Sequence, residues 1–460
     1  MRPIRPERSI AILFALGVVM ALLHRWTARG PIEGRATLAF GFLLLAALVA
    51  GDLAHRARLP RMTGYLLVGF AVGPSWLGLV RREELDALAF VEDAAVALIA
   101  LAAGSQLTFA ALARSRTALA RLATGAIAFP FAAVTLVMVS VSPWFPLSVH
   151  HSLGDGIAVA LVLGAWAAVS SPVVTVALLE ELDVQGDAPR ALLDVAIVQD
   201  VAVVILFALV LAAGKSLTSP GALNLVVAGI ALAGVMGSLA TGALSGFALS
   251  RCLRVVPRDP WPLVTATAFV AAAAARLLHL EPVIIGLAVG VAVENVAPRE
   301  AEGLRPELKR AMPLLAAAFF VLAGAGLRLG VLADLWPWVL LLAGLRVVSL
   351  RYGMRWAGGA GRHSEVTPAL ARAGWLGLIS QAGTALALGH LARRAFPEWG
   401  VSLEALIVAM IGAHLVAGPI CLRTALARTG DITGRGGGSR DAEAAVEGGG
   451  GVGVASRSGL

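Results

Sequence analysis

The chain has 460 residues, of which 58% are hydrophobic and only 14% are charged, whereas a typical globular domain has about 25% charged residues. This composition excludes a soluble enzyme, a disordered chain and a nucleic-acid-binding protein, and arginines in the cytoplasmic loops of a membrane protein explain the net charge of +8. The two cysteines, Cys252 and Cys421, give neither a disulfide framework nor a metal-ligand spacing.

Hydropathy predicts an all-α polytopic membrane protein with 13 or 14 transmembrane helices, because a bilayer core of about 30 Å needs about 20 apolar residues per helix. The predicted spans, in chain order, are 9–24, 36–54, 62–80, 88–104, 118–142, 156–182, 190–213, 222–250, 261–279, 281–297, 311–329, 333–353, 369–391 and 400–424. A signal peptide is the alternative for the short first span, but the segment after it lacks a small-residue cleavage pattern.

The spans divide the chain into three parts. We expect an extra N-terminal helix and loop at 1–35, a membrane domain at 36–425, and a disordered cytoplasmic tail at 426–460. The tail is too short for a nucleotide-binding regulatory domain, which needs on the order of 100 residues.

The loop charges predict the orientation. With the N-terminus inside, the N-terminal segment and the inner loops together carry twenty Lys and Arg residues and the outer loops carry nine. This bias predicts that both termini are cytoplasmic, and we expect the membrane to be the bacterial inner membrane.

The two halves of the chain resemble each other, which predicts an internal repeat. Three ordered matches, at offsets of 210–222 residues, pair Gly69–Gly73 with Gly286–Gly290, Gly104 with Gly326, and Ser170 with Ser380. Matching spans are seven apart, an odd number, so the two five-helix repeats must be inverted, as in secondary transporters. Accidental similarity between helices rich in small residues is the alternative.

Asp200 is the candidate functional residue, since it lies near the middle of span 190–213 beside Gln199. A carboxylate at that depth is either protonated or paired with a cation. The functional interpretation is a site that holds a proton or a monovalent cation by turns, and a permanent salt bridge is the alternative. Asp194 lies about 9 Å nearer the cytoplasm along the helix, and it either lines an entry funnel or is a plain interfacial residue.

Two further spans have polar segments that predict broken helices at matching positions of the repeats. The first has Pro172, which removes a backbone donor, and the second has no proline. The polar residues of the two segments are Ser170, Ser171 and Thr175 in the first, and Ser380, Gln381 and Thr384 in the second. Their free carbonyl ends would suit a cation, whereas their amide ends would repel it. Two merely kinked helices are the alternative.

Other polar residues and one glycine motif in the spans have structural interpretations. Arg346 lies deep in span 333–353, and we expect a partner role, with Asp200 as the obvious counter-charge. His414 reads as a packed, hydrogen-bonded histidine rather than a proton relay. Residues that read as interfacial at span ends are Glu92, Asp93, Arg276 and Glu294. The GxxxG motif of Gly242 and Gly246 favours packing within the chain over a dimer contact.

The ordered motifs GYLLVGFAVGP, SSPVVT, VAIVQDVAVV and ISQAG resemble those of the monovalent cation:proton antiporter superfamily, nearest its Kef-like potassium/proton branch. The resemblance covers about residues 36 to 425 and implies a sodium/proton antiporter-like fold. It also implies an elevator-type cycle, in which a core made of spans 5–7 and 12–14 moves against the other spans.

The resemblance implies exchange of protons for potassium or sodium, with Asp200 as the ion- and proton-carrying carboxylate. Gln199, Ser170, Ser171 and Thr175 would assist it, and the supporting residues would be Arg346, Ser380, Gln381 and Thr384. No cofactor is implied; the partners are the two ions and the lipid bilayer, and a homodimer is left open. Departures from the family pattern are Gln106 and Thr384, where glutamate is usual, and Ala382 in place of glycine.

Two alternatives come from other classes of protein. A cation channel or facilitator would use the same scaffold without proton coupling. An intramembrane aspartyl protease needs two aspartates in neighbouring spans, and only Asp200 lies near mid-depth, so we do not expect an enzyme.

Overall fold

The structure is a computed structural model, and it describes residues 6–27, 30–57, 59–149, 151–218, 225–255, 260–327, 329–359, 366–396 and 398–430. These residues are helical with short connections and contain no β-strand, which confirms the predicted fold class. Residues 431–460, which are most of the predicted tail, lie outside the described part.

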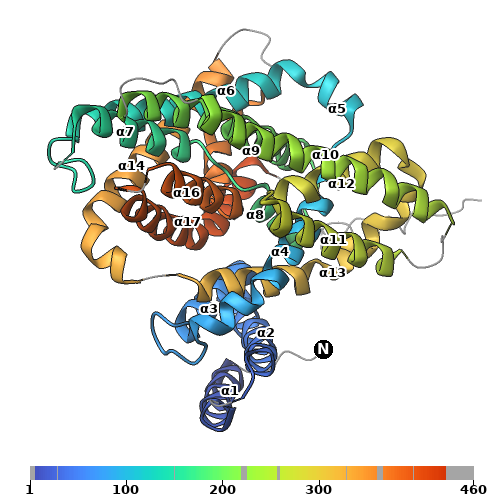
Figure 1. The fold of residues 1–460 in the computed structure, drawn as a ribbon. Helices are drawn as coiled ribbons and strands as arrows, with labels where there is room; N and C mark the ends of the chain where they lie inside the picture. Colours follow the sequence, from blue (N-terminus) through green and yellow to red (C-terminus); the bar gives the residue numbers. More distant parts are fainter. Residues whose placement is uncertain are drawn as a thin grey trace, which may run out of the picture.

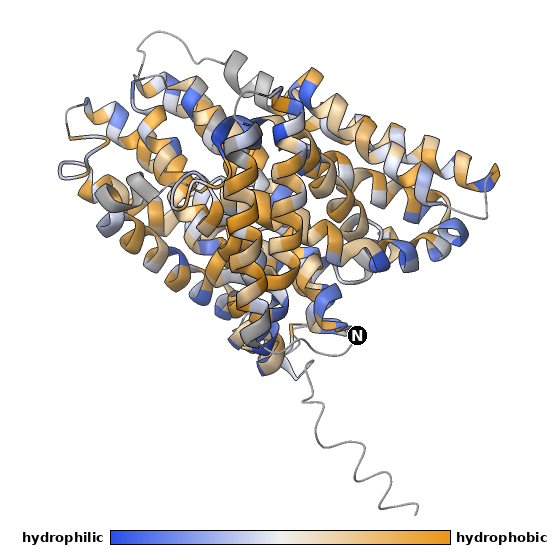
Figure 2. Cartoon of the chain, turned by 90° about the horizontal axis from the view of Figure 1, so that it is seen from below, coloured by the Kyte–Doolittle hydropathy of each residue, from blue (hydrophilic) through white to orange (hydrophobic). Residues whose placement is uncertain are grey.

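Helices occupy all fourteen predicted spans. They are α1 (Pro6–Thr27), α2 (Ile32–Arg56), α3 (Arg61–Val72), α4 (Arg82–Gly104), α5 (Phe109–Arg114), α6 (Arg116–Val141), α7 (Leu153–Ala167), α8 (Pro172–Leu182), α9 (Asp187–Thr218), α10 (Leu225–Val255), α11 (Trp261–Leu278), α12 (Pro282–Val296), α13 (Pro298–Ala325), α14 (Leu329–Gly359), α15 (Pro368–Ala373), the 3₁₀ helix η1 (Gly374–Leu378), α16 (Gly383–Ala395) and α17 (Gly400–Thr429). In the described part, ten segments are long and apolar enough to cross a membrane. Apolar residues dominate the middle of the helices (Figure 2).

The bounds of two helices differ from the prediction. α3 ends at Val72 because Gly73 is extended and Pro74 follows it. α4 begins at Arg82, so Glu92 and Asp93 lie ten and eleven residues inside this helix and do not open it. The prediction that these two acids sit at a span end was therefore wrong.

Spans 156–182 and 369–391 are broken, as predicted. The first consists of α7 and α8, separated by an extended segment in which Ser171 caps α8 and Pro172 is its first residue. The second consists of α15 with η1, followed by a non-helical segment from Ile379 to Ala382 and then α16. Each break frees backbone groups in the middle of the protein.

The helices form two groups, which lie side by side in Figure 1. In the first group, α6, α7 and α9 pack together and α14, α16 and α17 join them. In the second, α10 and α4 pack on α12, and α2 and α13 pack on α3. We call these the core group and the scaffold group. The most extensive contact between one helix of the core group and one helix of the scaffold group is that of α9 with α10.

Glycines allow the closest helix contacts. A Cβ atom on Gly69 of α3 would meet the Val321 carbonyl of α13, and one on Gly286 of α12 would meet the Ala97 carbonyl of α4. Gly69 and Gly286 occupy equivalent positions in the two predicted repeats, and α13 and α4 are equivalent helices. The two contacts are therefore related in the way that an inverted repeat would produce, and the repeat itself stays a prediction. Gly242 and Gly246 pack on α12 within the same chain.

Helix α14 offers a test of this packing. A Cβ on Gly353 would collide with the backbone carbonyl of Gly125 in α6, whereas one on Gly344 of the same helix would meet nothing within 4 Å. We therefore expect Gly353→Ala to destabilise the protein by about 1–3 kcal/mol, with little change for Gly344→Ala. Thermal unfolding of both variants in detergent measures the difference, and equal melting temperatures would contradict the packing.

Candidate functional site

The two broken segments lie against each other in the core group. The Ser171 amide donates a hydrogen bond to the Ser380 carbonyl (2.9 Å), and the Ser170 hydroxyl donates to the Leu378 carbonyl (2.7 Å). Trp166 at the end of α7 also donates from Nε1 to the carbonyl of Ala385 in α16 (3.2 Å). The breaks therefore form one crossing, joined by bonds between backbone groups that each broken helix leaves free.

Arg346 of α14 lies at this crossing and is fully buried. Its guanidinium donates to four backbone carbonyls, two from each broken segment. The acceptors are Ala167 (2.8 Å from Nε), Ile379 (2.7 Å from Nη1), Val169 (2.5 Å from Nη2) and Leu378 (2.8 Å from Nη2). A helix C-terminus has a partial negative charge, so the arginine stabilises the C-terminal ends of α7 and η1.

These bonds change two expectations from the sequence. None of the four hydrogen bonds of Arg346 goes to Asp200, which the sequence suggested as its counter-charge. The carbonyl ends that were expected to suit a transported cation instead bind the guanidinium. The expected partner role of Arg346 therefore concerns the backbone of both breaks.

Asp200 of α9 is fully buried beside the crossing. Neither of its carboxylate oxygens has a hydrogen-bond partner among the described residues. The hydroxyl of Thr384 lies beside the carboxylate, though not in hydrogen-bonding geometry. Thr384 is in the first turn of α16, so Asp200 faces the positive end of a helix dipole. The acid thus has a favourable field but no permanent basic partner within salt-bridge distance in the described part of the chain.

Other buried oxygens near this carboxylate also lack partners. Gln199 donates from Nε2 to the carbonyls of Ala126 (3.1 Å) and Ala168 (2.5 Å), while its Oε1 has no described partner. The Ser380 hydroxyl is likewise buried without one. A buried polar group without a partner costs about 1–3 kcal/mol. Such groups are uncommon in native structures, and each of them calls for an explanation, of which a functional site is one.

The other predicted ligands have structural bonds. Ser171 accepts from the Val174 amide at the start of α8 (3.4 Å), and the Thr175 hydroxyl donates to the Ser171 carbonyl (3.1 Å). Ser170 donates across the crossing, as described above. Each hydroxyl oxygen keeps acceptor capacity, so these residues both hold the break and can offer oxygens beside it.

His414 of α17 is a buried, hydrogen-bonded histidine, as the sequence predicted. Its Nδ1 lies 2.7 Å from Oε1 of Gln381, whose Nε2 donates to the Trp166 carbonyl (3.1 Å). An amide oxygen only accepts, so we assign the proton to Nδ1. This leaves Nε2 as a buried acceptor without a described partner. The pair holds the second break against the end of α7.

A cavity of about 690 Å³ opens between the ends of α4, α8 and α13. Two polar contacts cross from α8 to the scaffold there, Gln106 to Glu180 (3.3 Å) and Lys309 to Asp183 (2.6 Å). By the predicted orientation this is the cytoplasmic side of the molecule.

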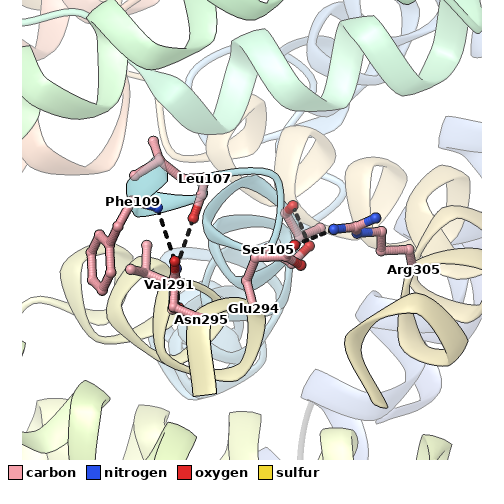
Figure 3. Close-up of polar contacts among 8 residues, drawn as sticks. Ser105, Leu107, Phe109, Val291, Glu294, Asn295 and Arg305 are labelled. Atoms are coloured by element: carbon pink, nitrogen blue, oxygen red, sulfur yellow. Dashed lines mark hydrogen bonds and ion pairs between the residues drawn. The ribbon is translucent and has the colours of Figure 1, made fainter. Parts of the chain in front are cut away.

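Next to this cavity, polar side chains connect α12 with the end of α4 (Figure 3). Asn295 donates to the Leu107 carbonyl (3.0 Å) and accepts from the Phe109 amide (2.9 Å). Glu294 forms an ion pair with Arg305. Because Glu294 is only 5% exposed, it is a buried, paired residue and not simply an interfacial one.

One acidic residue near Asp200 was not expected from the sequence. Glu281 precedes α12, and its carboxylate lies within range of the charges of Asp200 and Asp93. An acid at a predicted span end reads as interfacial, so hydropathy gave no reason to select it. The sequence signal that could have identified Glu281 is the short apolar segment that follows it, which forms α12 with only 15 residues.

The crossing of two broken helices beside a buried, unpaired carboxylate defines a membrane transporter of the antiporter fold. The fold matches the sodium proton antiporter MjNhaP1 from Methanocaldococcus jannaschii in two structures, with TM-scores of 0.61 and 0.65 at 14% identity. These matches cover 87% and 86% of this chain and 100% and 97% of the other.

Residues 40–426 match the family model described as sodium/hydrogen exchanger, transmembrane. The chain belongs to this sodium/hydrogen exchanger family, and with its apolar helices it is an integral membrane protein.

Curated relatives match over shorter stretches. The iron transporter MagA from Paramagnetospirillum magneticum is 32% identical over 163 residues, which is 35% of this chain and 34% of that protein. The probable Na(+)/H(+) antiporter GerT from Bacillus cereus is 30% identical over 172 residues (37% and 42%). The Na(+)/H(+)-K(+) antiporter GerN from Bacillus cereus is 34% identical over 89 residues (19% and 22%).

The chain thus spans about a fifth to two-fifths of the length of these curated relatives. By name, the family and the relatives are transporters and not enzymes, in agreement with the expectation for this chain.

Proposed function

We propose that this protein exchanges protons for a monovalent cation, sodium or potassium, across the bacterial inner membrane, with both termini in the cytoplasm. The observation that carries the proposal is the pair of Asp200 oxygens, which are fully buried and have no hydrogen-bond partner in the described part of the chain. Family membership and the printed names of GerT and GerN support the choice of ions.

The proposed chemistry is competition at one carboxylate. Ionised Asp200 binds the cation, together with Oε1 of Gln199 and hydroxyl oxygens of the first break. A proton that arrives on Asp200 removes the charge and releases the cation, since a neutral carboxyl group holds an alkali ion poorly. Because the acid holds one partner or the other, the two fluxes are coupled.

Movement of the core group carries this site from one side of the membrane to the other. Arg346 stays bonded to both breaks through the cycle, so its charge keeps the crossing together and does not compete with the cation for Asp200. Neutralisation of Asp200 by a proton or a cation lets the site pass through the low-dielectric middle of the bilayer.

The test is a flux measurement in proteoliposomes with a pH-sensitive dye inside. We expect each of sodium, potassium and lithium in turn, added outside acid-loaded vesicles, to release protons when it is a substrate. Ferrous iron belongs in the same panel because of the relative MagA. Cation flux without any proton movement would select the alternative, a channel or facilitator on the same scaffold.

The exchange is expected to be electroneutral. Gln199 stands beside Asp200 where a second carboxylate would add a charge, so one proton replaces one monovalent cation. A net charge crossing the membrane would be worth about 2.3 kcal/mol per 100 mV, and an electroneutral cycle avoids this term. Potassium and valinomycin can clamp the potential while sodium-driven proton flux is recorded. A flux that changes severalfold between 0 and about 100 mV would contradict one-for-one exchange.

A further inference from the structure

The turn between α11 and α12 places an acidic side chain below the membrane surface. α12 has 15 residues and is about 22 Å long, shorter than the bilayer core of about 30 Å. Its first residue follows Glu281, whose amide donates to the hydroxyl of Ser238 in α10 (3.0 Å). Ser238 is fully buried and lies thirteen residues inside α10. The backbone of Glu281 therefore lies beside the middle of α10, while its side chain is partly exposed.

The same turn lies close to the candidate site. A Cβ atom on Gly383, the first residue of α16, would be 3.3 Å from Cγ2 of Val283 in the first turn of α12. Gly383 is followed by Thr384, whose hydroxyl lies beside Asp200. The start of α12 in the scaffold group thus meets the start of α16 in the core group, where the carboxylate is.

The charged groups around Glu281 are mostly acidic. Asp200 faces it from α9 and Asp93 from α4. Basic groups in this region are His279 in the same turn and Arg276 of α11, which forms an ion pair with Asp93 (2.7 Å) and lies beside Glu92. Among the described residues no basic side chain forms a salt bridge with Glu281 itself. Glu281 and Asp200 therefore lie on opposite sides of the boundary between the scaffold group and the core group of helices. No described basic side chain lies between them.

We propose that Glu281 is a second carboxylate of the transport pathway, which faces Asp200 from the scaffold and sets the pH range and the cation affinity of exchange. The inference rests on the proposed function and deepens it. Like charges oppose simultaneous ionisation, so an ionised Glu281 holds the proton on Asp200 more firmly in the state where the two acids face each other. It also attracts a cation into the same space.

The proposal predicts that Glu281→Gln moves the pH of half-maximal exchange downward. Without the facing negative charge Asp200 loses its proton more readily, and the shift is about 0.5–1.5 pH units at an effective dielectric constant of about 20. We also expect the KM for the cation to rise severalfold, about 3- to 10-fold, because the attraction is lost. Proteoliposome exchange measured from pH 5.5 to 9 gives both quantities.

Three variants separate charge from structure. Glu281→Asp keeps the charge, so its pH profile should stay near that of the unchanged protein. Glu281→Asn is neutral and is a favourable residue before a helix, so it repeats the test if Glu281→Gln does not reach the membrane. Glu300→Gln removes a scaffold glutamate that pairs with Arg254 (3.4 Å), and we expect no shift from it.

The outcomes distinguish this inference from the proposed function. If Glu281→Gln and Glu281→Asn leave both the pH profile and the KM unchanged while Asp200→Asn is inactive, Glu281 has no role in the pathway and the exchange mechanism stands. If Asp200→Asn exchanges ions normally, the proposed function itself fails. A shift that Glu281→Asp shows equally would also overturn the inference, because it would not depend on charge.

Discussion

Asp200→Asn is expected to abolish cation/proton exchange while the protein still inserts and folds. Asparagine has nearly the same shape as aspartic acid but cannot give up a proton or present a negative charge. Both oxygens of Asp200 lack partners in the described structure, so the change breaks no observed hydrogen bond. We expect exchange to fall at least about 100-fold, which corresponds to about 2.7 kcal/mol. Dye-based flux in proteoliposomes measures the loss.

The matched control is Asp194→Asn on the same helix. Asp194 lies six residues before Asp200 and is only partly buried, so the same chemical change should leave most of the exchange intact. Size-exclusion chromatography in detergent shows whether each variant is folded. Loss of exchange in both variants, or in neither, would argue against a special role for Asp200.

Arg346→Met is expected to cause the largest loss of stability. The substitution keeps much of the side-chain volume but removes four hydrogen bonds to carbonyls of both broken segments. Those carbonyls have few other donors within the membrane, and loss of a buried charged partner typically costs about 3–5 kcal/mol. Thermal unfolding in detergent, followed by the recovery of monodisperse protein after heating, measures the effect.

Two further variants of α14 make this prediction specific. Arg351→Met changes an exposed arginine five residues further along the same helix, and we expect little loss. Arg346→Lys keeps a charge but cannot reach four acceptors with one ammonium group, so its stability should lie between the other two. A melting temperature for Arg346→Met equal to that of Arg351→Met would show that the crossing does not depend on the guanidinium.

The site has two opposite charges that serve different elements of the crossing. Arg346 lies at the C-terminal ends of α7 and η1, and Asp200 lies near the N-terminal end of α16. Each charge therefore faces the helix end of opposite polarity. A direct salt bridge between them would have occupied the acid, whereas in this arrangement the Asp200 oxygens have no hydrogen-bond partner among the described residues.

Much of the fold follows from the sequence. Long apolar segments must be helices in a bilayer, because every backbone donor and acceptor needs an internal partner there. Hydropathy therefore located the helical segments, ten of which are long and apolar enough to cross a membrane in the described part. Pro172 and the polar segments predicted where two helices break, since a missing donor and competing hydroxyl groups weaken a helix. The burial of Asp200 agrees with the apolar residues on either side of it.

What the sequence could not determine is which groups meet. Arg346 and Asp200 looked like partners because both were predicted to lie deep in their spans. In the structure, Arg346 instead donates hydrogen bonds to backbone carbonyls of segments distant in the chain. Glu281 had no distinguishing signal in the sequence, and the structure places its amide against Ser238 in the middle of α10. Hydropathy depends on the average environment along one helix, whereas pairing depends on how helices from distant parts of the chain cross. Only the tertiary structure fixes those crossings.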